Sequence, residues 1–267
     1  MNIFNRNISI LEVVPKVVQF VTACTRACRL FEKPWHLISC YVRKQPLAND
    51  VLVMRSGNKL AVSNHAHDVV TIFVVFCKED YGTDFSGNCV LDIGANIGIF
   101  TVCAALNGAK KIVSIEPSRD AYSTLEKNIE LNSLGDVVTP LQFAVGRANH
   151  ESIPFPVSAS PYNQLDGDHT GVETTEVKTL TLKTVMDDWF DGNIDLLKMD
   201  CEGAEFEIFA STSSVELARI CELKMEYHKD EYIDLLKRLN EENFETTFHQ
   251  PGRKPSTGTV WLVNQAS

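Results

Sequence analysis

The sequence lacks several features that would each indicate a class of protein. It has no run of about 18 uncharged apolar residues, the length that spans a bilayer. The nearest candidate, residues 8–23, is interrupted by charged residues and a proline and lacks the layout of a signal peptide. Its eight cysteines include no C-x-x-C pair, the spacing of many zinc and redox sites. We therefore predict neither a transmembrane segment nor a zinc or disulfide framework.

Basic residues are also few. The chain has 25 lysines and arginines against 35 aspartates and glutamates, a net charge of −10. Residues 1–59 hold nine basic and three acidic residues, or +6, so the remainder carries −16. An acidic body disfavours a nucleic-acid substrate, because the phosphates would be repelled. We expect the basic arm to pack on the acidic body or to be solvated, in preference to binding a membrane.

The chain does contain enough apolar residues to bury a sizeable core, 44% of 267. Five cysteines fall in or beside apolar runs, namely Cys77, Cys89, Cys103, Cys201 and Cys221. This placement favours small buried thiols in a reducing compartment. We therefore expect a cytoplasmic location.

The first part of the chain is predicted to form an arm. Residues 7–31 have apolar positions at helical spacing and are expected to form one amphipathic helix, or two helices broken near Pro15. The rest of the body or a partner subunit would cover the apolar face, so a homo-oligomer formed through this arm is one of the two alternatives. From residue 35 the pattern shortens to strand-like pieces, 51–54 and 60–62, which form a small hairpin around a turn at 56–58. A helix is expected over 68–76.

Residues 89–100, CVLDIGANIGIF, predict a buried strand that turns directly into a helix. Gly94 and Gly98 let the backbone approach a ligand, and amides at the helix start can bind an anion. A dinucleotide loop would need glycines at Asn96 and Ile99, so that fingerprint is absent. The pattern D-x-G-A-N-x-G instead resembles the first motif of class I S-adenosylmethionine-dependent methyltransferases. That resemblance implies that a loop made of Asp92, Gly94, Ala95, Asn96 and Gly98 wraps the methionine part of the cofactor.

The next two predicted strands supply the other candidate cofactor contacts. The strand over 111–115 ends in Glu116, whose two carboxylate oxygens can accept both ribose hydroxyls. The alternative for Glu116 is an acid that caps a helix. A third strand is predicted over 137–145, and its end would lie beside the adenine. Phe143 and Ala144 are therefore candidates for contact with the base, although Phe143 is equally compatible with the core.

Charged residues gather after the fourth and fifth predicted strands, 194–200 and 219–227. Lys198, Asp200, Glu202 and Glu205 follow or end the fourth strand, while Glu226 and His228 follow the fifth. So many charged groups are costly to bury, which makes a functional site the better interpretation. Neighbouring strand ends would bring Glu226 and His228 toward Asp200.

Four motifs together resemble the FkbM family of methyltransferases: VLDIGANIGIF at 90–100, IEP at 115–117, DLLKMDCEGAEFEIF at 195–209 and EYH at 226–228. The resemblance implies an α/β fold, a doubly wound, mostly parallel seven-stranded methyltransferase sheet with helices on both faces. It also implies S-adenosylmethionine as donor and O-methylation of a hydroxyl on a sugar, glycan or secondary metabolite. We expect residues 1–67 to form a helical arm and hairpin, and 68–267 a Rossmann-like methyltransferase domain.

In-line transfer to an alcohol oxygen requires a positioned acceptor and a base for its proton. The candidates for catalysis are Asp200, His228 and Glu226, with Lys198 as an orienting or charge-balancing partner. Asp200 is also a candidate contact of the cofactor, and Glu202 and Glu205 are candidates to bind the acceptor. These groups could also hold a divalent cation, but the spacing does not require one, so no metal ligand is predicted. The alternatives are a cofactor-binding scaffold without turnover and transfer to nitrogen. The irregular segment 147–176, with a lid at 158–170, is expected to select the acceptor.

Overall fold

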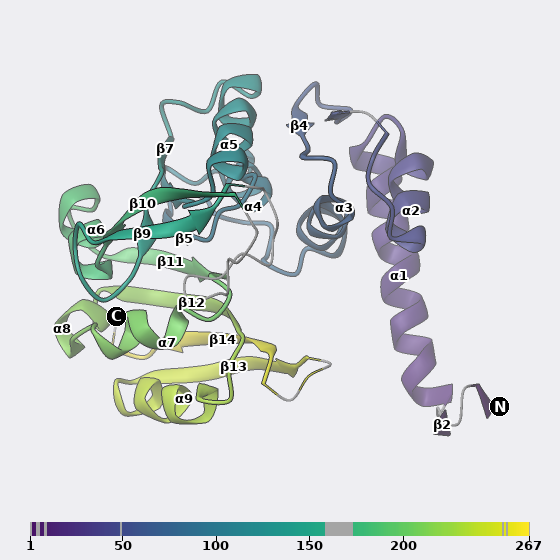
Figure 1. Cartoon of the computed structure of the whole chain (residues 1–267). Helices are drawn as coiled ribbons and strands as arrows, with labels where there is room; N and C mark the ends of the chain where they lie inside the picture. Colours follow the sequence, from purple (N-terminus) through teal and green to yellow (C-terminus); the bar gives the residue numbers. More distant parts are fainter. Residues whose placement is uncertain are drawn as a thin grey trace. The chain divides into compact units, whose positions relative to one another are not determined.

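The computed structural model describes residues 2–3, 6–7, 10–48, 50–157, 173–252, 254 and 256–266, with side chains from Val14 onward. The chain divides into two compact units, Met1–Gly82 and Thr83–Ser267, which are described separately (Figure 1). The predicted boundary between residues 67 and 68 stays a prediction. In the structure the helical segment that follows residue 67 packs within the first unit.

The first unit is mainly helical. The predicted arm is a single helix that continues through Pro15, which lies early enough in the helix to remove only one backbone bond near its start. The prediction of strand-like structure from residue 35 was wrong over the first stretch, because a helix begins there with Pro34 in its first turn, a favoured position for proline. The elements of the first unit are β1 Asn2–Ile3, β2 Arg6–Asn7, α1 Ile10–Leu30, α2 Pro34–Arg43, the predicted hairpin of β3 Val51–Val53 and β4 Lys59–Ala61, α3 Ala66–Ile72 and the π-helix η1 Phe73–Lys78.

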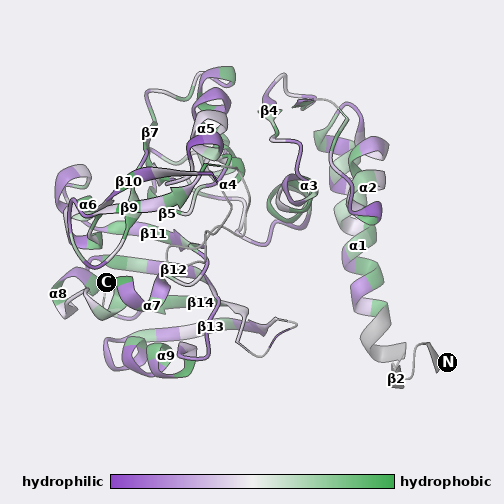
Figure 2. Cartoon of the chain, in the orientation of Figure 1, coloured by the Kyte–Doolittle hydropathy of each residue, from purple (hydrophilic) through white to green (hydrophobic). Residues whose placement is uncertain are grey.

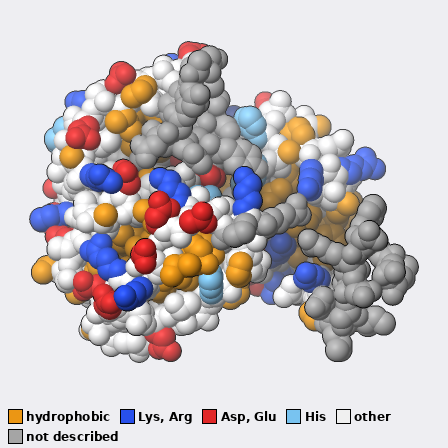
Figure 3. Space-filling view, turned by 60° about the horizontal axis from the view of Figure 1, so that its bottom comes forward, with side chains coloured by type: hydrophobic (Ala, Val, Ile, Leu, Met, Phe, Trp, Pro, Cys, Tyr) orange, Lys and Arg blue, Asp and Glu red, His pale blue; other side chains and the backbone are white. Residues whose placement is uncertain are grey.

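Aromatic packing holds the first unit together. Tyr41 of α2 stacks on Phe73 of η1 with ring centroids 4.0 Å apart, and Phe31 meets Phe76 edge to face. Arg26 forms an ion pair with Glu79 at 2.5 Å. Apolar residues also remain on the surface of α1, and Figure 3 shows hydrophobic and basic side chains side by side on this unit. Within the described residues, no helix is both long and apolar enough to cross a membrane.

A seven-stranded sheet organises the second unit, in the order β13-β14-β12-β11-β5-β6-β7. All neighbours are parallel except at β14, which runs antiparallel to both β12 and β13. The predicted fold class is thus confirmed. The elements of this layer are β5 Cys89–Ile93, α4 Ile99–Leu106, β6 Lys111–Ile115, α5 Arg119–Leu131, β7 Val138–Leu141, α6 Leu182–Trp189, β11 Ile194–Met199, α7 Glu205–Ala210, α8 Ser214–Leu217, β12 Ile220–Tyr227, α9 Tyr232–Glu241, β13 Phe244–Pro251 and β14 Gly258–Asn264.

The two faces of the sheet differ in polarity near the carboxyl ends of its central strands. Alternate residues such as Leu91, Val113 and Leu197 pack with α6, α7 and α9 in the main hydrophobic core. The central strands are correspondingly rich in hydrophobic residues in Figure 2. Because side chains alternate along a strand, Asp92 and Lys198 point to the opposite face, where Asp92 contacts α4. The buried charges of Asp92 and Lys198 therefore lie on the face that α4 covers.

The third predicted strand, 137–145, was wrong as a single element. Strand β7 stops pairing with β6 at Leu141, and the chain then leaves the sheet. β8, Ala144–Val145, pairs instead with β10, Thr174–Leu180, in a second sheet completed by β9, Ser152–Pro156. Ala144 packs there with Phe155 and Val177 in a core of their own. This tertiary contact overrides the mostly apolar pattern of residues 137–145. The predicted lid at 158–170 lies outside the described residues.

Candidate active site

A tightly bent loop, residues 94–98, joins β5 to α4 and is called the cofactor loop below. Three of its residues have left-handed backbone conformations: Gly94 (φ 75°), Asn96 (φ 50°) and Gly98 (φ 81°). The amides of Gly94 and Ala95 both donate to the carbonyl of Ile115 at 3.0 Å. The loop is thus fixed to the end of β6 by its own backbone, and α4 starts immediately after it.

Gly94 is required by close packing as well as by its conformation. A Cβ atom at this position would lie 1.9 Å from the carbonyl oxygen of Asp200. At Gly98 a Cβ would lie 2.4 Å from Cδ1 of Leu125. The loop backbone therefore lies directly against the backbone that presents Asp200, so the loop and the end of β11 form one continuous site.

A buried polar network supports the loop from below. Asp92 has no exposed surface; one of its carboxylate oxygens accepts from Oγ1 of Thr101 at 2.7 Å, and the other pairs with Nζ of Lys198 at 3.1 Å. Lys198 also donates to the carbonyl of Gly94 at 2.7 Å. Burial opposes the charge of Lys198, but Asp92 and then Asp200 outweigh it and raise its pKa. Lys198, a candidate catalytic partner, therefore lies beneath the loop, where its charged amino group connects Asp92 to the backbone of Gly94.

Glu116 follows β6 and lies beside the same loop. One carboxylate oxygen accepts from the amide of Asn96 and the other from the amide of Ser118, both at 2.8 Å. Burial raises the pKa of Glu116 to about 7, against the opposing effect of these two hydrogen bonds. A carboxylate oxygen has two lone pairs, so each oxygen can still accept a hydroxyl. A glycine loop with no room for a Cβ and an acid with remaining acceptor capacity fit an adenosyl cofactor.

The two candidate adenine contacts differ in their surroundings. Phe143 is partly buried and packs against the main core, while the side chain of Ala144 is buried in the small core of the second sheet. Their contact with a base stays a prediction, and for Ala144 it would involve the main chain.

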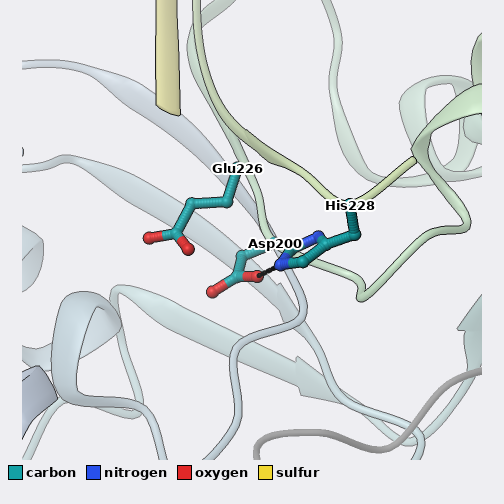
Figure 4. A group of neighbouring side chains, drawn as sticks. All are labelled: Asp200, Glu226 and His228. Atoms are coloured by element: carbon teal, nitrogen blue, oxygen red, sulfur yellow. Dashed lines mark ion pairs between the residues drawn. The ribbon is translucent and has the colours of Figure 1, made fainter. Parts of the chain in front are cut away.

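A second group of side chains lies where β11 and β12 end. We call Asp200, Glu202, Glu205, Glu226 and His228 the acid–histidine cluster. The Nε2 atom of His228 lies 3.5 Å from Glu202 and 4.0 Å from Asp200. Figure 4 shows Glu226 and His228 reaching from the same segment toward Asp200. The structure therefore brings together the three residues that the sequence placed at neighbouring strand ends.

The charges of the cluster shift one another's pKa values. Burial alone would disfavour a charged His228, but its hydrogen bond to Glu205 and the carboxylates of Glu202 and Asp200 raise its pKa to about 9. The charge of Asp200, followed by burial, raises the pKa of Glu226 to about 7. Burial is the main reason that the pKa of Glu202 also rises to about 7. Negative charge is thus in excess at these strand ends.

Glu205 differs from the rest of the cluster because it is completely buried. Its Oε1 accepts from Nδ1 of His228 and from the amide of Cys201, each at 3.2 Å. Its Oε2 has no hydrogen-bond partner among the described residues. The side chain faces His228, so its predicted contact with the acceptor stays untested and its observed contact is with the histidine. Glu202, the other candidate acceptor contact, is half-buried and lies beside the same ring.

Sequence reasoning missed the polar layer made by Thr101 and Ser114. Their hydroxyls lie 2.8 Å apart, and both residues are buried. The sequence did contain a signal for this layer. Thr101 is the one hydroxyl residue in the otherwise apolar helix IFTVCAAL, and Ser114 is the one hydroxyl residue in the buried strand KIVSI. It also missed the role of Glu205 in holding His228, since no spacing rule connects a residue after β11 with one after β12.

This sheet order, with its glycine loop after β5 and its acid after β6, defines the fold class of class I methyltransferases. The family model described as the methyltransferase FkbM domain matches residues 92–246, which is more than half of the chain. The chain therefore belongs to the FkbM family of methyltransferases, and S-adenosylmethionine is its cofactor.

Relatives match shorter parts. The ribosomal protein L11 methyltransferase of Anoxybacillus flavithermus is 26% identical over 98 residues, 37% of this chain and 30% of that protein. Its counterpart in Bacillus pumilus is 30% identical over 97 residues, 36% of this chain and 30% of that protein. The chain thus matches less than a third of the length of these relatives. Among solved structures, a methyltransferase FkbM from Methylobacillus flagellatus is 12% identical, with a TM-score of 0.45, covering 94% of this chain and 60% of that chain.

Proposed function

We propose that the chain transfers the methyl group of S-adenosylmethionine to a hydroxyl oxygen of a sugar, glycan or other small metabolite. The observation that carries the proposal is the contact between the cofactor loop and the start of the acid–histidine cluster, where Gly94 abuts the carbonyl of Asp200. A methyl donor held by the loop therefore has carboxylates and a histidine beside it. These groups suit an acceptor that has a proton to lose.

The residues divide the work between them. When bound, S-adenosylmethionine supplies a methyl group on a positively charged sulfur. Glu116 accepts the ribose hydroxyls, and the backbone of the cofactor loop holds the methionine part. Asp200, the leading candidate for the base, takes the proton of the acceptor hydroxyl as the new O–CH₃ bond forms and the S–CH₃ bond breaks. Most of the acceleration comes from holding the two reactants in line at contact distance.

Two other activities are consistent with the same fold. A neutral amine needs less help from a base, so transfer to nitrogen would depend less on Asp200. The relatives are named for methylation of ribosomal protein L11, which makes a protein acceptor the second candidate. The acidic second unit supports a small-molecule or glycan acceptor over a nucleic acid. A homo-oligomer through the N-terminal arm stays a prediction.

The test begins with calorimetry of the purified chain, titrated with S-adenosylmethionine and separately with a nicotinamide dinucleotide. We expect binding of the first alone; binding of the dinucleotide alone would contradict the proposal. Transfer is then measured on sugars, free amines and purified L11. Asp200→Asn should retain cofactor binding and lose transfer to the sugar hydroxyls. If the unmodified chain methylates only amines or only L11, the alternative acceptor is the right one.

A further inference from the structure

Three side chains of the acid–histidine cluster have the arrangement of metal ligands. Asp200, Glu226 and His228 each offer one ligand atom, and these atoms all lie within 4.8 Å of one another. They come from the ends of two neighbouring strands and face a common space (Figure 4). Three ligands that share one ion through bonds of about 2.0–2.2 Å lie about 3–4 Å from one another. The three side chains therefore have to move closer together to share one ion.

The histidine is oriented as a metal ligand is. Ligating histidines nearly always donate their second ring N–H to a carboxylate or carbonyl, which fixes the tautomer and the ring orientation. Nδ1 of His228 lies 3.2 Å from Oε1 of Glu205, a residue with no exposed surface. Nε2 is thereby left to face Glu202, at 3.5 Å, and Asp200, at 4.0 Å. This nitrogen is the atom that the ligand set requires.

Carboxylates outnumber the imidazole in this cluster. Four carboxylates, those of Asp200, Glu202, Glu205 and Glu226, accompany a single imidazole. Lys198 is committed to Asp92 and to the carbonyl of Gly94. In addition, Oε2 of Glu205 is buried with no hydrogen-bond partner within the described part of the chain. A buried, unpaired carboxylate oxygen is costly, and a dication beside His228 would offset that cost electrostatically.

We propose that Asp200, Glu226 and His228 bind one divalent metal ion of the Mn²⁺ class. Two carboxylate oxygens and one imidazole nitrogen form a mixed donor set that suits such ions, and three protein ligands leave coordination positions open. The proposal rests on the proposed function and deepens it. A hydroxyl bound to the ion would release its proton to solvent more readily, and Asp200 would then act as a ligand instead of as the base. It replaces the expectation from sequence that no metal is bound.

The test is calorimetric titration of MnCl₂ into the full chain after treatment with a chelator, without cofactor or acceptor. We expect one Mn²⁺ per chain, and an affinity at least tenfold lower in Glu226→Gln. The matched control is Glu222→Gln. Glu222 lies on the same strand, is also half-buried and pairs with Lys224 at 3.2 Å, so its substitution should leave the Mn²⁺ affinity within about twofold. Circular dichroism of each variant verifies that it is folded.

Glu205→Gln provides a second variant, which changes a residue that contacts His228 and is not itself a proposed ligand. The amide retains an oxygen that can accept from His228 but removes the negative charge that orients the ring, and changes of this kind lower metal affinity about 10–100-fold. Absence of saturable Mn²⁺ binding by the unmodified chain would overturn the proposal. Equal binding by the unmodified chain and by Glu226→Gln would also overturn it, because the ion would lie elsewhere.

The same preparations distinguish this proposal from the proposed function. If the chain binds S-adenosylmethionine and transfers its methyl group but does not bind Mn²⁺, the metal site is refuted and the proposed methyltransferase activity stands. Binding of one Mn²⁺ that is weakened by Glu226→Gln, in a chain that binds no S-adenosylmethionine, would support the metal site and refute the proposed function.

Discussion

The cofactor loop and the acid–histidine cluster are in contact at Gly94 and Asp200, but their charged side chains are balanced differently. Beneath the loop, Asp92 is matched by Lys198 and by the hydroxyl of Thr101. In the cluster, carboxylates outnumber cations, and the pKa of Glu226 rises to about 7. Asp92 and Lys198 neutralise each other, and the hydrogen bonds of this pair to Thr101 and to the carbonyl of Gly94 hold the loop in place. The cluster holds charge in excess, available to an acceptor or an ion.

The largest effect is expected when the buried ion pair beneath the cofactor loop loses its cation. In Lys198→Met, Asp92 keeps its burial but loses its ion-pair partner, and an uncompensated buried charge costs about 3–5 kcal/mol of the free energy of unfolding. Urea unfolding measures the loss. Lys183→Met is the control, since Lys183 is exposed and pairs with Asp187 on the surface, where solvent screens the pair and its loss should change stability little. Equal losses in the two variants would mean that the Asp92–Lys198 pair does not stabilise the loop.

The contact between the two regions can be tested directly by Gly94→Ala. An alanine there has φ near 75° and a Cβ only 1.9 Å from the Asp200 carbonyl, so we expect about 1–2 kcal/mol of backbone strain and a further 1–3 kcal/mol of overpacking, roughly. Gly87→Ala separates the two effects, because Gly87 has φ 77° with open space around it. Urea unfolding should show the larger loss at Gly94, with cofactor affinity reduced only there. Similar losses at both positions would show that the close contact is tolerated.

The sequence predicted the loop better than the cluster for a physical reason. Strand, glycine turn and helix are consecutive, so residues 89–100 specify the loop locally, and the acid after the next strand follows from the parallel order of the sheet. Neighbouring strand ends similarly brought Asp200, Glu226 and His228 together. The buried bond between Glu205 and His228 depends on how α7 starts, and no pattern in the sequence encodes it.

The errors of the sequence analysis have related causes. The run 137–145 is mostly apolar, but its last residues pair with β10, which lies about thirty residues further along the chain. Only the tertiary fold decides which sheet they join. Helix α2 was missed even though Pro34 marks its first turn, because the short apolar pieces that follow it dominated the interpretation.

Glu116 provides a smaller effect, on binding. Glu116→Gln should weaken S-adenosylmethionine binding by about 1.5–3 kcal/mol, since hydroxyl donors bind a carboxylate more strongly than an amide. Calorimetry measures the change, and an unchanged affinity would show that the ribose contact is misassigned.

The pH dependence of binding tests the same residue. The pKa of Glu116 is raised to about 7 by burial, with Lys198 favouring its charged form and Asp92 opposing it. The ribose hydroxyls favour the ionised form, so affinity should fall about tenfold from about pH 8 to about pH 6. Without cofactor, the contribution of Glu116 to the free energy of unfolding should decrease as pH rises from about 4.5 to about 7. A Gln variant with the same pH dependence would assign it to another group.

The smallest expected effect concerns the independence of the two regions. Thr101→Val keeps the shape of the side chain but removes the hydroxyl that donates to Asp92 at 2.7 Å, at a cost of about 1–2 kcal/mol for a buried acceptor that loses one partner. In the control Thr124→Val, the lost hydroxyl bonds a carbonyl at the helix surface, so the change should stay within about 0.5 kcal/mol. Because Asp92 keeps Lys198, Mn²⁺ affinity should stay within about twofold in Thr101→Val. A marked loss of Mn²⁺ binding would show that the loop network and the cluster act as one electrostatic unit.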